Sequence, residues 1–394
     1  FNFNFMKKKI AILGSTGSIG KTLLKIISKD KDNFSIELLT ANKNHKLLLK
    51  QAKKFNVKNL IVEDIESFKL LKKKLSNSKT KVFNSFDDLK NILKNKVDYT
   101  MNSITGINGL IPTLKIINFT KTIAIANKES IICGWNLIQK KLYRYKTQFL
   151  PVDSEHFSLW FGLKKIDNKS IDQIILTASG GPLLKTPLNK FRKISINQAL
   201  NHPNWKMGNK ISIDSATLIN KIYEVIEARN IFNISYKKIK IIIHPKSYVH
   251  ALIKFNNGFI KIIAHDTTMK IPIFNTLYHN KIKKFPTKNI DYKILNNLNF
   301  TEINKQRFPM VKILNLLPNR YSLFETVIVS ANDTLVELFL KKKIRFTDIQ
   351  KKLFELILKN EFLKYKKITP KKAQDIIDLN NYVRLKIYKN VYKS

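Results

Sequence analysis

A glycine-rich turn near the N-terminus constrains the fold more than any other feature of this sequence. An apolar run over residues 9–13 leads into Gly14, Gly17 and Gly20, and apolar residues at helical spacing follow. Glycines let backbone N–H groups approach a pyrophosphate, and a helix N-terminus favours negative charge. A tight turn that binds nothing is the alternative. The pattern predicts a dinucleotide site between a strand and a helix.

The first 150 residues alternate short apolar runs with lysine-rich segments of helical periodicity. This alternation predicts a Rossmann-like parallel sheet with helices on both faces, and a ligand at the carboxyl ends of the strands. The expected strands cover residues 9–13, 35–40, 59–62, 97–103 and 122–126.

After residue 150 the pattern changes to strands with polar clusters, and later to amphipathic helices. We therefore expect an α/β fold with three structural parts. We expect a dinucleotide-binding domain over 1–150 and a central α/β catalytic domain over 151–280. A linker over 281–306 and a C-terminal helical bundle over 307–394 complete the chain. In the bundle, one face of an amphipathic helix is predicted from the spacing of Ile349, Leu353, Leu356 and Ile357.

The charge balance is strongly basic, with 72 Lys and Arg against 28 Asp and Glu, a net charge of +44. Such a charge invites a nucleic-acid-binding interpretation, which predicts steeply salt-dependent binding and no metal requirement. The basic residues are nevertheless spread along the whole chain, and no nucleic-acid-binding motif accompanies them. We therefore expect no specific nucleic-acid partner, and we attribute the charge to AT-rich codon usage.

The cysteine content and the hydropathy of the sequence indicate the cellular compartment of the protein. Cys133 is the single cysteine, so no intramolecular disulfide can form and a reducing compartment is expected. No apolar run approaches the ~20 residues that span a bilayer. We expect a cytoplasmic protein without a membrane partner, with a plastid-type organelle as the alternative. Met6 is the expected natural start, and five preceding residues are too few for a signal sequence.

The end of the second expected strand bears on which dinucleotide is bound. A site for NAD usually has a carboxylate there, which holds the ribose hydroxyl. This chain instead has Asn42, Lys43 and Asn44, two amides and a cation. That environment suits a 2′-phosphate, so NADPH is favoured, although Lys43 alone could be a solvated lysine.

Acidic residues after a later strand suggest a metal site. Asp153 and Glu155 are two apart, so in extended structure their side chains point the same way. Glu224 lies on an expected helix, sharing a face with Asn220 and Lys221. Three carboxylates suit magnesium or manganese rather than zinc. A solvated acidic turn is the alternative for the first pair.

Hydroxyl and amide groups near these acids suggest a phosphate pocket. The loop 177–182 offers backbone donors and the Ser179 hydroxyl. Ser215 is expected at the start of a helix, where anions bind well. The polar loop 201–208 contains Trp205 and is interpreted as a lid that excludes water, or alternatively as an aromatic plug.

Several of these segments together resemble one family, the 1-deoxy-D-xylulose 5-phosphate reductoisomerases. The long block from His202 to Lys221 is the most specific of them. Asn42, Leu183 and the pair Asn332-Asp333 depart from the family pattern. The matching segments are GSTGSIG from Gly14, IANKES from Ile125, VDSEH from Val152, TASGGP from Thr177, HPNWKMGNKISIDSATLINK from His202, IHPKS from Ile243 and IRFTDI from Ile344.

The resemblance implies an enzyme that isomerises 1-deoxy-D-xylulose 5-phosphate and reduces the product with NADPH to 2-C-methyl-D-erythritol 4-phosphate. This is a step of non-mevalonate isoprenoid synthesis that needs one divalent ion per subunit, in a chain that is usually a homodimer. The metal ligands it implies are Asp153, Glu155 and Glu224. The catalytic residues it implies are these three with Lys128, His156 and His202, and His250 lies near the site. The substrate contacts are Lys128, Ser154, Glu155, Ser179, His202, Trp205, Ser215, Asn220, Lys221 and Glu224. The cofactor contacts it implies are Thr16, Gly17, Ser18, Ile19, Asn44, Asn127 and Glu129. To these we add Asn42, Lys43 and Gly208 as expected cofactor contacts.

A different enzyme class stays open at this point. An enzyme like aspartate-semialdehyde dehydrogenase would share the glycine-rich turn and would need a nucleophilic cysteine near residue 130. Cys133 has no obvious activating partner in the sequence, so we expect it to be a buried core residue.

Overall fold

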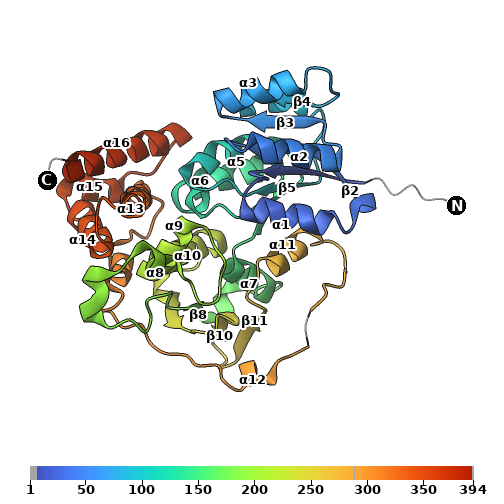
Figure 1. Cartoon of the computed structure of the whole chain (residues 1–394). Coiled ribbons are helices and arrows are strands. Elements are labelled where there is room, and N and C mark those ends of the chain that lie inside the picture. The colour runs from blue at the N-terminus through green and yellow to red at the C-terminus, as the bar shows by residue number, and fades with distance from the viewer. Residues whose placement is uncertain (1–6, 288, 393–394) are drawn as a thin grey trace. The chain divides into compact units, whose positions relative to one another are not determined.

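The computed structural model describes residues 7–287 and 289–392, so Met6 and the residues before it lie outside the described part. Contacts divide the chain into two compact units, each of which contains a sheet (Figure 1). Of the described residues, the first unit comprises those within 1–130, 137–153 and 269–286, and the second comprises those within 131–136, 154–268 and 287–394.

The first unit is built on a seven-stranded sheet within the described residues, in the order β4-β3-β2-β1-β5-β6-β7. Every neighbouring pair is parallel, as the alternating pattern predicts. The short β4 was not expected from the sequence. The strands are β1 (Lys8–Leu13), β2 (Phe34–Ala41), β3 (Asn59–Val62), β4 (Lys81–Phe83), β5 (Tyr99–Asn102), β6 (Thr122–Ile125) and β7 (Gln148–Pro151).

Helices connect these strands in two sets. From β1 the chain runs outward to β4 in one direction and then from β5 to β7 in the other. Because parallel crossovers are right-handed, the two sets lie on opposite faces of the sheet. Helix α1 buries Leu23, Leu24 and Ile27 against it. The helices are α1 (Ser18–Ile27), α2 (His45–Phe55), α3 (Ile65–Lys74), α4 (Leu89–Ile92), α5 (Leu110–Ile116) and α6 (Lys128–Tyr145).

The second unit contains a four-stranded sheet in the order β11-β10-β8-β9, again counted over the described residues. Only β8 and β9 are parallel, and β10 pairs antiparallel with both of its neighbours. Helices α7 (Ser154–Gly162) and α10 (Ile219–Phe232) cover one face through a core that includes Leu159, Ile174 and Val225. The strands are β8 (Ile171–Ala178), β9 (Ile239–Ile243), β10 (Val249–Phe255) and β11 (Ile260–Ala264).

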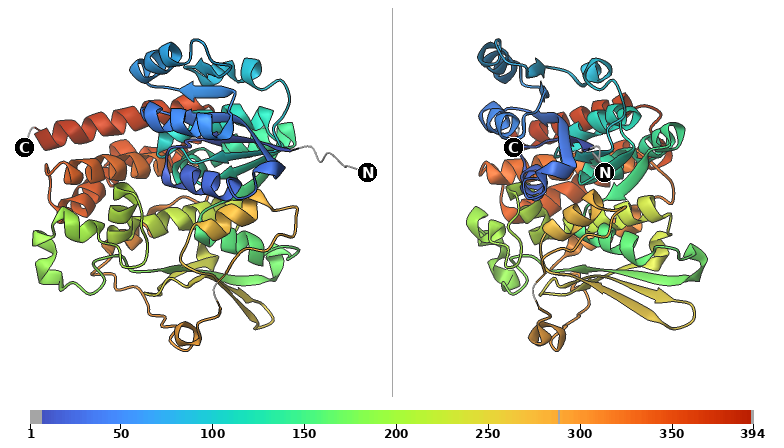
Figure 2. Two further views of the ribbon diagram at one scale, coloured as in Figure 1. Left: turned by 45° about the vertical axis from the view of Figure 1, so that its right-hand side comes forward. Right: turned by 90° about the vertical axis from the view of Figure 1, so that its right-hand side faces the viewer.

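Helices dominate the remainder of the second unit, and those of the C-terminal region lie together as a bundle (Figure 2). The four apolar residues expected on one helix face are all buried within α14. The helices are α8 (Ile196–Leu200), α9 (Asn209–Thr217), α12 (Tyr292–Leu295), α13 (Phe324–Leu340), α14 (Phe346–Ile357), α15 (Asn360–Leu363) and α16 (Ala373–Tyr392).

The two units do not coincide with the four segments drawn from the sequence. Residues 269–286, which include α11 (Lys270–Leu277), return to the first unit, where α11 packs against α1. Tyr278 donates its hydroxyl to Asp30 (2.5 Å), which fastens this return segment. No local composition marks the return, because it is made by long-range packing.

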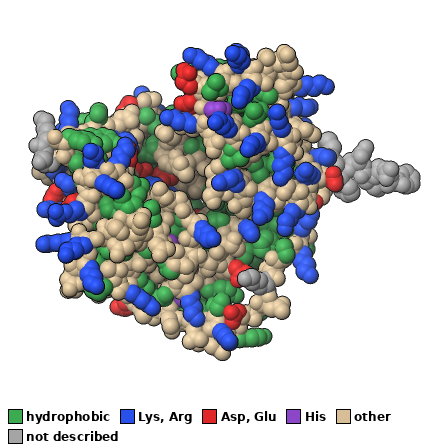
Figure 3. Space-filling model, in the orientation of Figure 1, with side chains coloured by type: hydrophobic (Ala, Val, Ile, Leu, Met, Phe, Trp, Pro, Cys, Tyr) green, Lys and Arg blue, Asp and Glu red, His purple; other side chains and the backbone are tan. Residues whose placement is uncertain are grey.

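Lysine and arginine side chains are scattered widely over the face drawn in Figure 3. They form no single stripe there, in keeping with their even spread along the sequence. Among the described residues, no helix combines the length and the apolar character needed to cross a membrane.

Candidate active site

The glycine-rich turn after β1 adopts a conformation that needs two of its glycines, Gly14 and Gly20. Gly14 has φ +77°, and a Cβ there would lie 3.0 Å from the backbone of Ser103. A Cβ on Gly20 would lie 2.5 Å from the Cα of Ser15, so α1 packs closely on the turn. Larger residues would push the helix away from the strand end. Of the expected cofactor contacts at this edge, Thr16 lies in the turn, Gly17 is the N-cap of α1, and Ser18 and Ile19 begin the helix.

Two further groups of expected cofactor contacts follow strands of the same parallel sheet, and therefore lie at the same edge as the turn. Asn42, Lys43 and Asn44 are exposed beyond β2, and Asn44 also caps α2 by accepting from the Leu47 N–H (3.2 Å). Asn127 caps α6 by accepting from the Ser130 N–H (2.8 Å).

The side-chain amide of Asn127 also holds neighbouring groups in place. It donates to the Gly106 carbonyl (2.9 Å) and to the Glu129 carboxylate (3.0 Å). These helix caps are structural roles that the sequence motif alone does not reveal.

The three expected metal ligands come together. Ligand oxygens of Asp153, Glu155 and Glu224 all lie within 4.8 Å of one another. Asp153 directly precedes α7, so the short connection from β7 places its carboxylate beside that of Glu155. The expectation that this pair lies in extended structure is wrong, because α7 begins at Ser154 and Glu155 lies in its first turn.

Two ammonium groups accompany the carboxylates. Lys128 pairs with Asp153. Lys221 lies 3.0 Å from Glu155 and also pairs with Glu224. Because Glu224 is only 1% exposed, its charge needs such partners to be tolerated. The carboxylates also accept hydrogen bonds from Asn220 to Glu224 (2.6 Å) and from Ser154 to Glu155 (2.6 Å).

His156 is fully buried behind this group. Its Nε2 lies 2.8 Å from the backbone carbonyl of Glu224, and its Nδ1 lies 3.7 Å from the Glu227 carboxylate. The ring therefore joins α7 to the backbone of α10. This geometry suits a positioning residue, whereas the family resemblance implies a catalytic one.

A pair of stacked histidines lies near Glu155. His250 has its Nδ1 4.0 Å from the Glu155 carboxylate, and its ring stacks on His265 at 3.8 Å. Burial lowers the pKa of His265 to about 3. Sequence reasoning missed His265, because a lone histidine after a strand belongs to no motif. Trp205 meets His250 edge to face at 6.3 Å.

The expected phosphate contacts lie on three adjoining segments. Gly181 has φ +67°, and a Cβ there would lie 2.6 Å from the Ser215 carbonyl oxygen. The glycine thus lets the loop that carries Ser179 lie directly against α9. The expectation that Ser215 starts a helix is wrong, since it lies in the last turn of α9.

Leu218 is responsible for this difference. Its φ of +66° ends α9, and α10 begins at Ile219, with Asn220 and Lys221 in its first turn. A left-handed leucine gives no signal in the sequence, where glycine or asparagine would normally mark such a break.

The loop 201–208 is held by side-chain hydrogen bonds. His202 Nδ1 accepts from the N–H groups of Asn204 (3.2 Å) and Trp205 (3.1 Å). Its Nε2–H can then donate to the Ser179 hydroxyl at 2.9 Å. Asn204, which the sequence did not single out, donates to the Pro245 carbonyl (2.5 Å) and the Ser247 hydroxyl (3.1 Å). Gly208 is exposed and immediately precedes α9, and no atom of the described residues lies within 4 Å of its Cβ position.

Family models match three successive parts of the chain. Residues 10–134 match 1-deoxy-D-xylulose 5-phosphate reductoisomerase, residues 149–232 match its C-terminal domain, and residues 266–386 match a DXP reductoisomerase C-terminal domain. The 1-deoxy-D-xylulose 5-phosphate reductoisomerase of Pelagibacter ubique is 59% identical over 382 residues, which is 96% of this chain and 98% of the relative.

The chain belongs to the 1-deoxy-D-xylulose 5-phosphate reductoisomerase family.

Solved structures of this reductoisomerase family have the same fold. The Zymomonas mobilis enzyme in complex with NADPH superposes with a TM-score of 0.86 at 32% identity, covering 98% of this chain and 99% of the other. A second reductoisomerase, in complex with NADPH, fosmidomycin and magnesium, gives a TM-score of 0.90 at 28% identity, covering 98% of each chain. The predicted α/β fold is therefore confirmed.

Burial of His202 should make the stability of the folded chain depend on pH. Burial lowers the pKa of His202 to about 4 from an ordinary value near 6.5. Between these values the unfolded chain binds a proton that the folded chain does not, so stability falls as the pH falls from 6.5 towards 4. Over that window, we expect the melting temperature of the wild type to fall by about 2–4 °C more than that of His202→Gln. Calorimetric melting curves with parallel pH dependence would contradict this.

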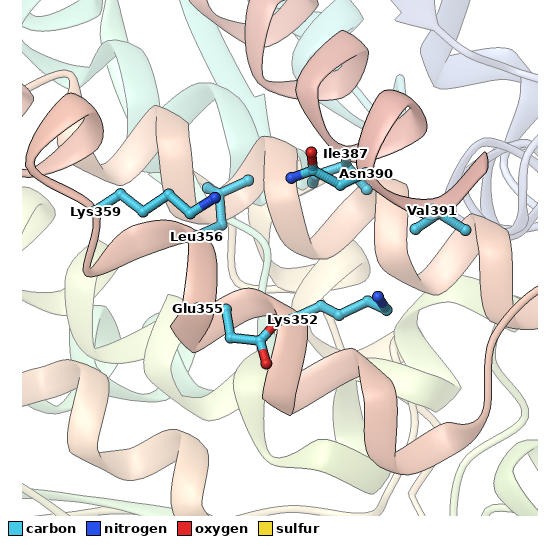
Figure 4. Close-up of a pocket in the computed structure, with 7 residues that line it drawn as sticks. All are labelled: Lys352, Glu355, Leu356, Lys359, Ile387, Asn390 and Val391. Atoms are coloured by element: carbon cyan, nitrogen blue, oxygen red, sulfur yellow. The ribbon is translucent and has the colours of Figure 1, made fainter. Parts of the chain in front are cut away.

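A small cavity lies elsewhere in the second unit (Figure 4). It lies beside α14 and α16 and contains none of the expected site residues. Its lining residues are Lys352, Glu355, Leu356, Lys359, Ile387, Asn390 and Val391.

Proposed function

We propose that this chain isomerises 1-deoxy-D-xylulose 5-phosphate and reduces the product with NADPH to 2-C-methyl-D-erythritol 4-phosphate, in non-mevalonate isoprenoid synthesis. Family membership supports the reaction. The observation that carries the proposal is the convergence of three carboxylates within 4.8 Å of one another, accompanied by Lys128 and Lys221. The similar relatives are bacterial, which supports a cytoplasmic location that cell fractionation would test.

Asp153, Glu155 and Glu224 would hold one Mg²⁺ or Mn²⁺ ion. Their donor atoms are all carboxylate oxygens, which fit these hard cations and not zinc. When bound, the ion supplies a Lewis acid that polarises a carbonyl oxygen and stabilises negative charge. The chain's own contribution is to fix the carboxylates, through Asn220 at Glu224 and through His156 at the α10 backbone.

Ser179, Ser215, Asn220 and Lys221 would bind the substrate phosphate. His202 and Gly181 both donate to the Ser179 oxygen, so its own proton can be donated to an anion. Lys221 adds the positive charge. Phosphate contacts remote from the reacting carbons hold the fragments in register while the skeleton rearranges.

The other expected substrate contacts are proposed to act around the reacting carbons. Lys128 would stabilise oxyanion charge, and Ser154 would contact a substrate oxygen. The loop with His202 and Trp205 would exclude water.

The segment 1–150 would bind NADPH, which supplies a hydride. The start of α1 would bind the pyrophosphate, and Asn42, Lys43 and Asn44 the 2′-phosphate, with Asn127, Glu129 and Gly208 as further contacts. The segment 151–280 would carry the metal and the substrate. The segment 281–306 would link it to the helical part, 307–394.

The decisive experiment follows the loss of NADPH absorbance when the chain is mixed with 1-deoxy-D-xylulose 5-phosphate. Oxidation should occur with Mg²⁺ or Mn²⁺, stop on addition of a chelator and resume when the ion is restored. Oxidation that continues unchanged with the chelator would remove the metal from the proposal. No oxidation under any condition would contradict the proposed function itself.

We also propose that the chain forms a homodimer through the edge strand β11. Phe259, Ile260 and Ile262 are 73%, 57% and 51% exposed, and an exposed apolar edge strand is suited to pair with a second copy. The double variant Ile260→Lys/Ile262→Lys should shift the mass in light scattering from two chains to one. Ile282→Lys, at a fully exposed isoleucine elsewhere, is the matched control. A wild-type chain that is a monomer at all concentrations would contradict the proposal.

A further inference from the structure

The C-terminal helix α13 reaches the helix that carries Ser215. Asn332 of α13 is completely buried, and its Nδ2 donates to the Asp214 carboxylate at 2.8 Å. Asp214 is itself only 2% exposed and directly precedes Ser215 in α9. The two residues are 118 positions apart in the sequence, so this contact ties the helical bundle to the expected phosphate pocket.

A lysine completes the connection. Lys210 lies 3.2 Å from Asp214 and 3.0 Å from Asp333, the residue after Asn332. Its ammonium also lies 5.5 Å from the centre of the Tyr223 ring, next to Glu224 in α10. We call Lys210, Asp214, Asn332 and Asp333 the α9–α13 clasp. It joins α9 to α13 by directional polar contacts.

Burial makes a purely stabilising role a poor explanation for the clasp. Replacing buried polar pairs by apolar residues is often neutral or stabilising, because their desolvation offsets much of their attraction. The remaining Asn332 oxygen is also buried without a hydrogen-bond partner among the described residues. Directional contacts of this kind are instead suited to fixing one orientation of a helix.

The orientation of α9 determines where Ser215 points. Successive residues of an α-helix are turned by about 100° about its axis, so holding Asp214 against α13 sets the direction of the next side chain. On the loop side, Gly181 already brings its backbone against the Ser215 carbonyl. A small rotation of α9 would therefore separate the Ser215 hydroxyl from the other expected phosphate contacts.

We propose that Asn332 and Asp214 are positioning residues, which hold α9 so that Ser215 can bind the substrate phosphate. This inference rests on the proposed function in one respect, the assignment of Ser215 to the phosphate. It gives the C-terminal helical segment a role in recognising the substrate, although that segment carries none of the expected substrate contacts.

The test compares Asn332→Ala and Asp214→Asn with the wild type in the full chain. The readouts are the Kd for inorganic phosphate by calorimetry, and the KM values for 1-deoxy-D-xylulose 5-phosphate and for NADPH. We expect each variant to raise the phosphate Kd and the sugar-phosphate KM on the order of 10-fold, with the NADPH KM unchanged. The double variant Asp214→Asn/Asn332→Asp reverses the hydrogen bond and should recover part of the loss.

Thr334→Val is the matched control. Thr334 is as buried as Asn332 in the same helix, but its hydroxyl donates to the Ser330 carbonyl of α13 itself (2.7 Å). It should lose comparable stability without weakening phosphate binding. The inference is overturned if the control raises the phosphate Kd equally, or if neither clasp variant raises it. Should Asn332→Ala fail to fold, Asp214→Asn, which keeps the shape of the side chain, decides the question.

The phosphate titration also separates this inference from the proposed function. The wild type could oxidise NADPH with the sugar phosphate while the clasp variants bind phosphate as tightly as the wild type. That result would support the proposed function and contradict the positioning role of Asn332 and Asp214. A wild type that binds phosphate without oxidising NADPH would remove the function, while the clasp could still be judged by the same Kd values.

Discussion

Glu224→Gln is expected to abolish turnover while leaving NADPH binding nearly intact. The substitution keeps the shape of the side chain but removes one of three carboxylates that lie within 4.8 Å of one another. A metal ion contributes several kcal/mol of charge stabilisation in the transition state, and each 1.36 kcal/mol is tenfold in rate. We therefore expect kcat to fall by at least about a thousandfold.

NADPH affinity should be unaffected, because the expected cofactor contacts lie on the first unit and at Gly208, and Glu224 is not among them. Steady-state rates and NADPH fluorescence titration measure the two effects separately. Glu325→Gln is the control, since Glu325 is likewise a buried glutamate of the second unit and hydrogen-bonds to Ser322. Wild-type-like turnover of Glu224→Gln would remove Glu224 as a metal ligand.

The protonation state of Glu325 makes it a suitable control. Burial raises the pKa of Glu325 to about 7, so near neutral pH much of this side chain is already uncharged in the folded chain. Substitution by glutamine therefore removes little charge. Glu224, in contrast, lies beside the Lys221 ammonium. The comparison thus isolates the loss of a paired carboxylate from the loss of a buried acid in general.

The sequence predicts the first sheet and the grouping of the acidic side chains for identifiable reasons. Parallel strands appear in the sequence as short apolar runs, and the glycines at 14 and 20 are required by close backbone approach. The grouping of two acidic side chains can also be predicted correctly when their local secondary structure is not. Asp153 and Glu155 lie together even though α7 begins between them, with Asp153 just before the helix and Glu155 in its first turn.

Other features depend on contacts that no local pattern records. The break at Leu218 is held in a left-handed conformation by packing, so Ser215 falls at the end of one helix and Asn220 in the first turn of the next. Asn204 is significant because it contacts Pro245, and His265 because it stacks on His250. The residues next to them in the sequence do not indicate these contacts. The return of residues 269–286 to the first unit is likewise a tertiary effect.

Lys221→Gln should weaken binding of the sugar phosphate strongly while sparing the metal. Lys221 is only 5% exposed and contacts both Glu155 and Glu224. If its ammonium serves the substrate phosphate, its loss removes a charge-assisted contact worth about 1.5–3 kcal/mol. The KM for 1-deoxy-D-xylulose 5-phosphate should then rise by about 10- to 150-fold.

The affinity of Lys221→Gln for a divalent metal ion should increase or stay unchanged. Removing the ammonium leaves Glu155 and Glu224 with less positive charge nearby, and uncompensated carboxylates attract a divalent cation more strongly. Titration with Mn²⁺, followed by its electron-spin signal, would measure this directly. Lys254→Gln removes an exposed lysine paired with Asp172 on the sheet and serves as the control. A large loss of Mn²⁺ affinity with an unchanged KM would show that Lys221 organises the carboxylates and does not bind the phosphate.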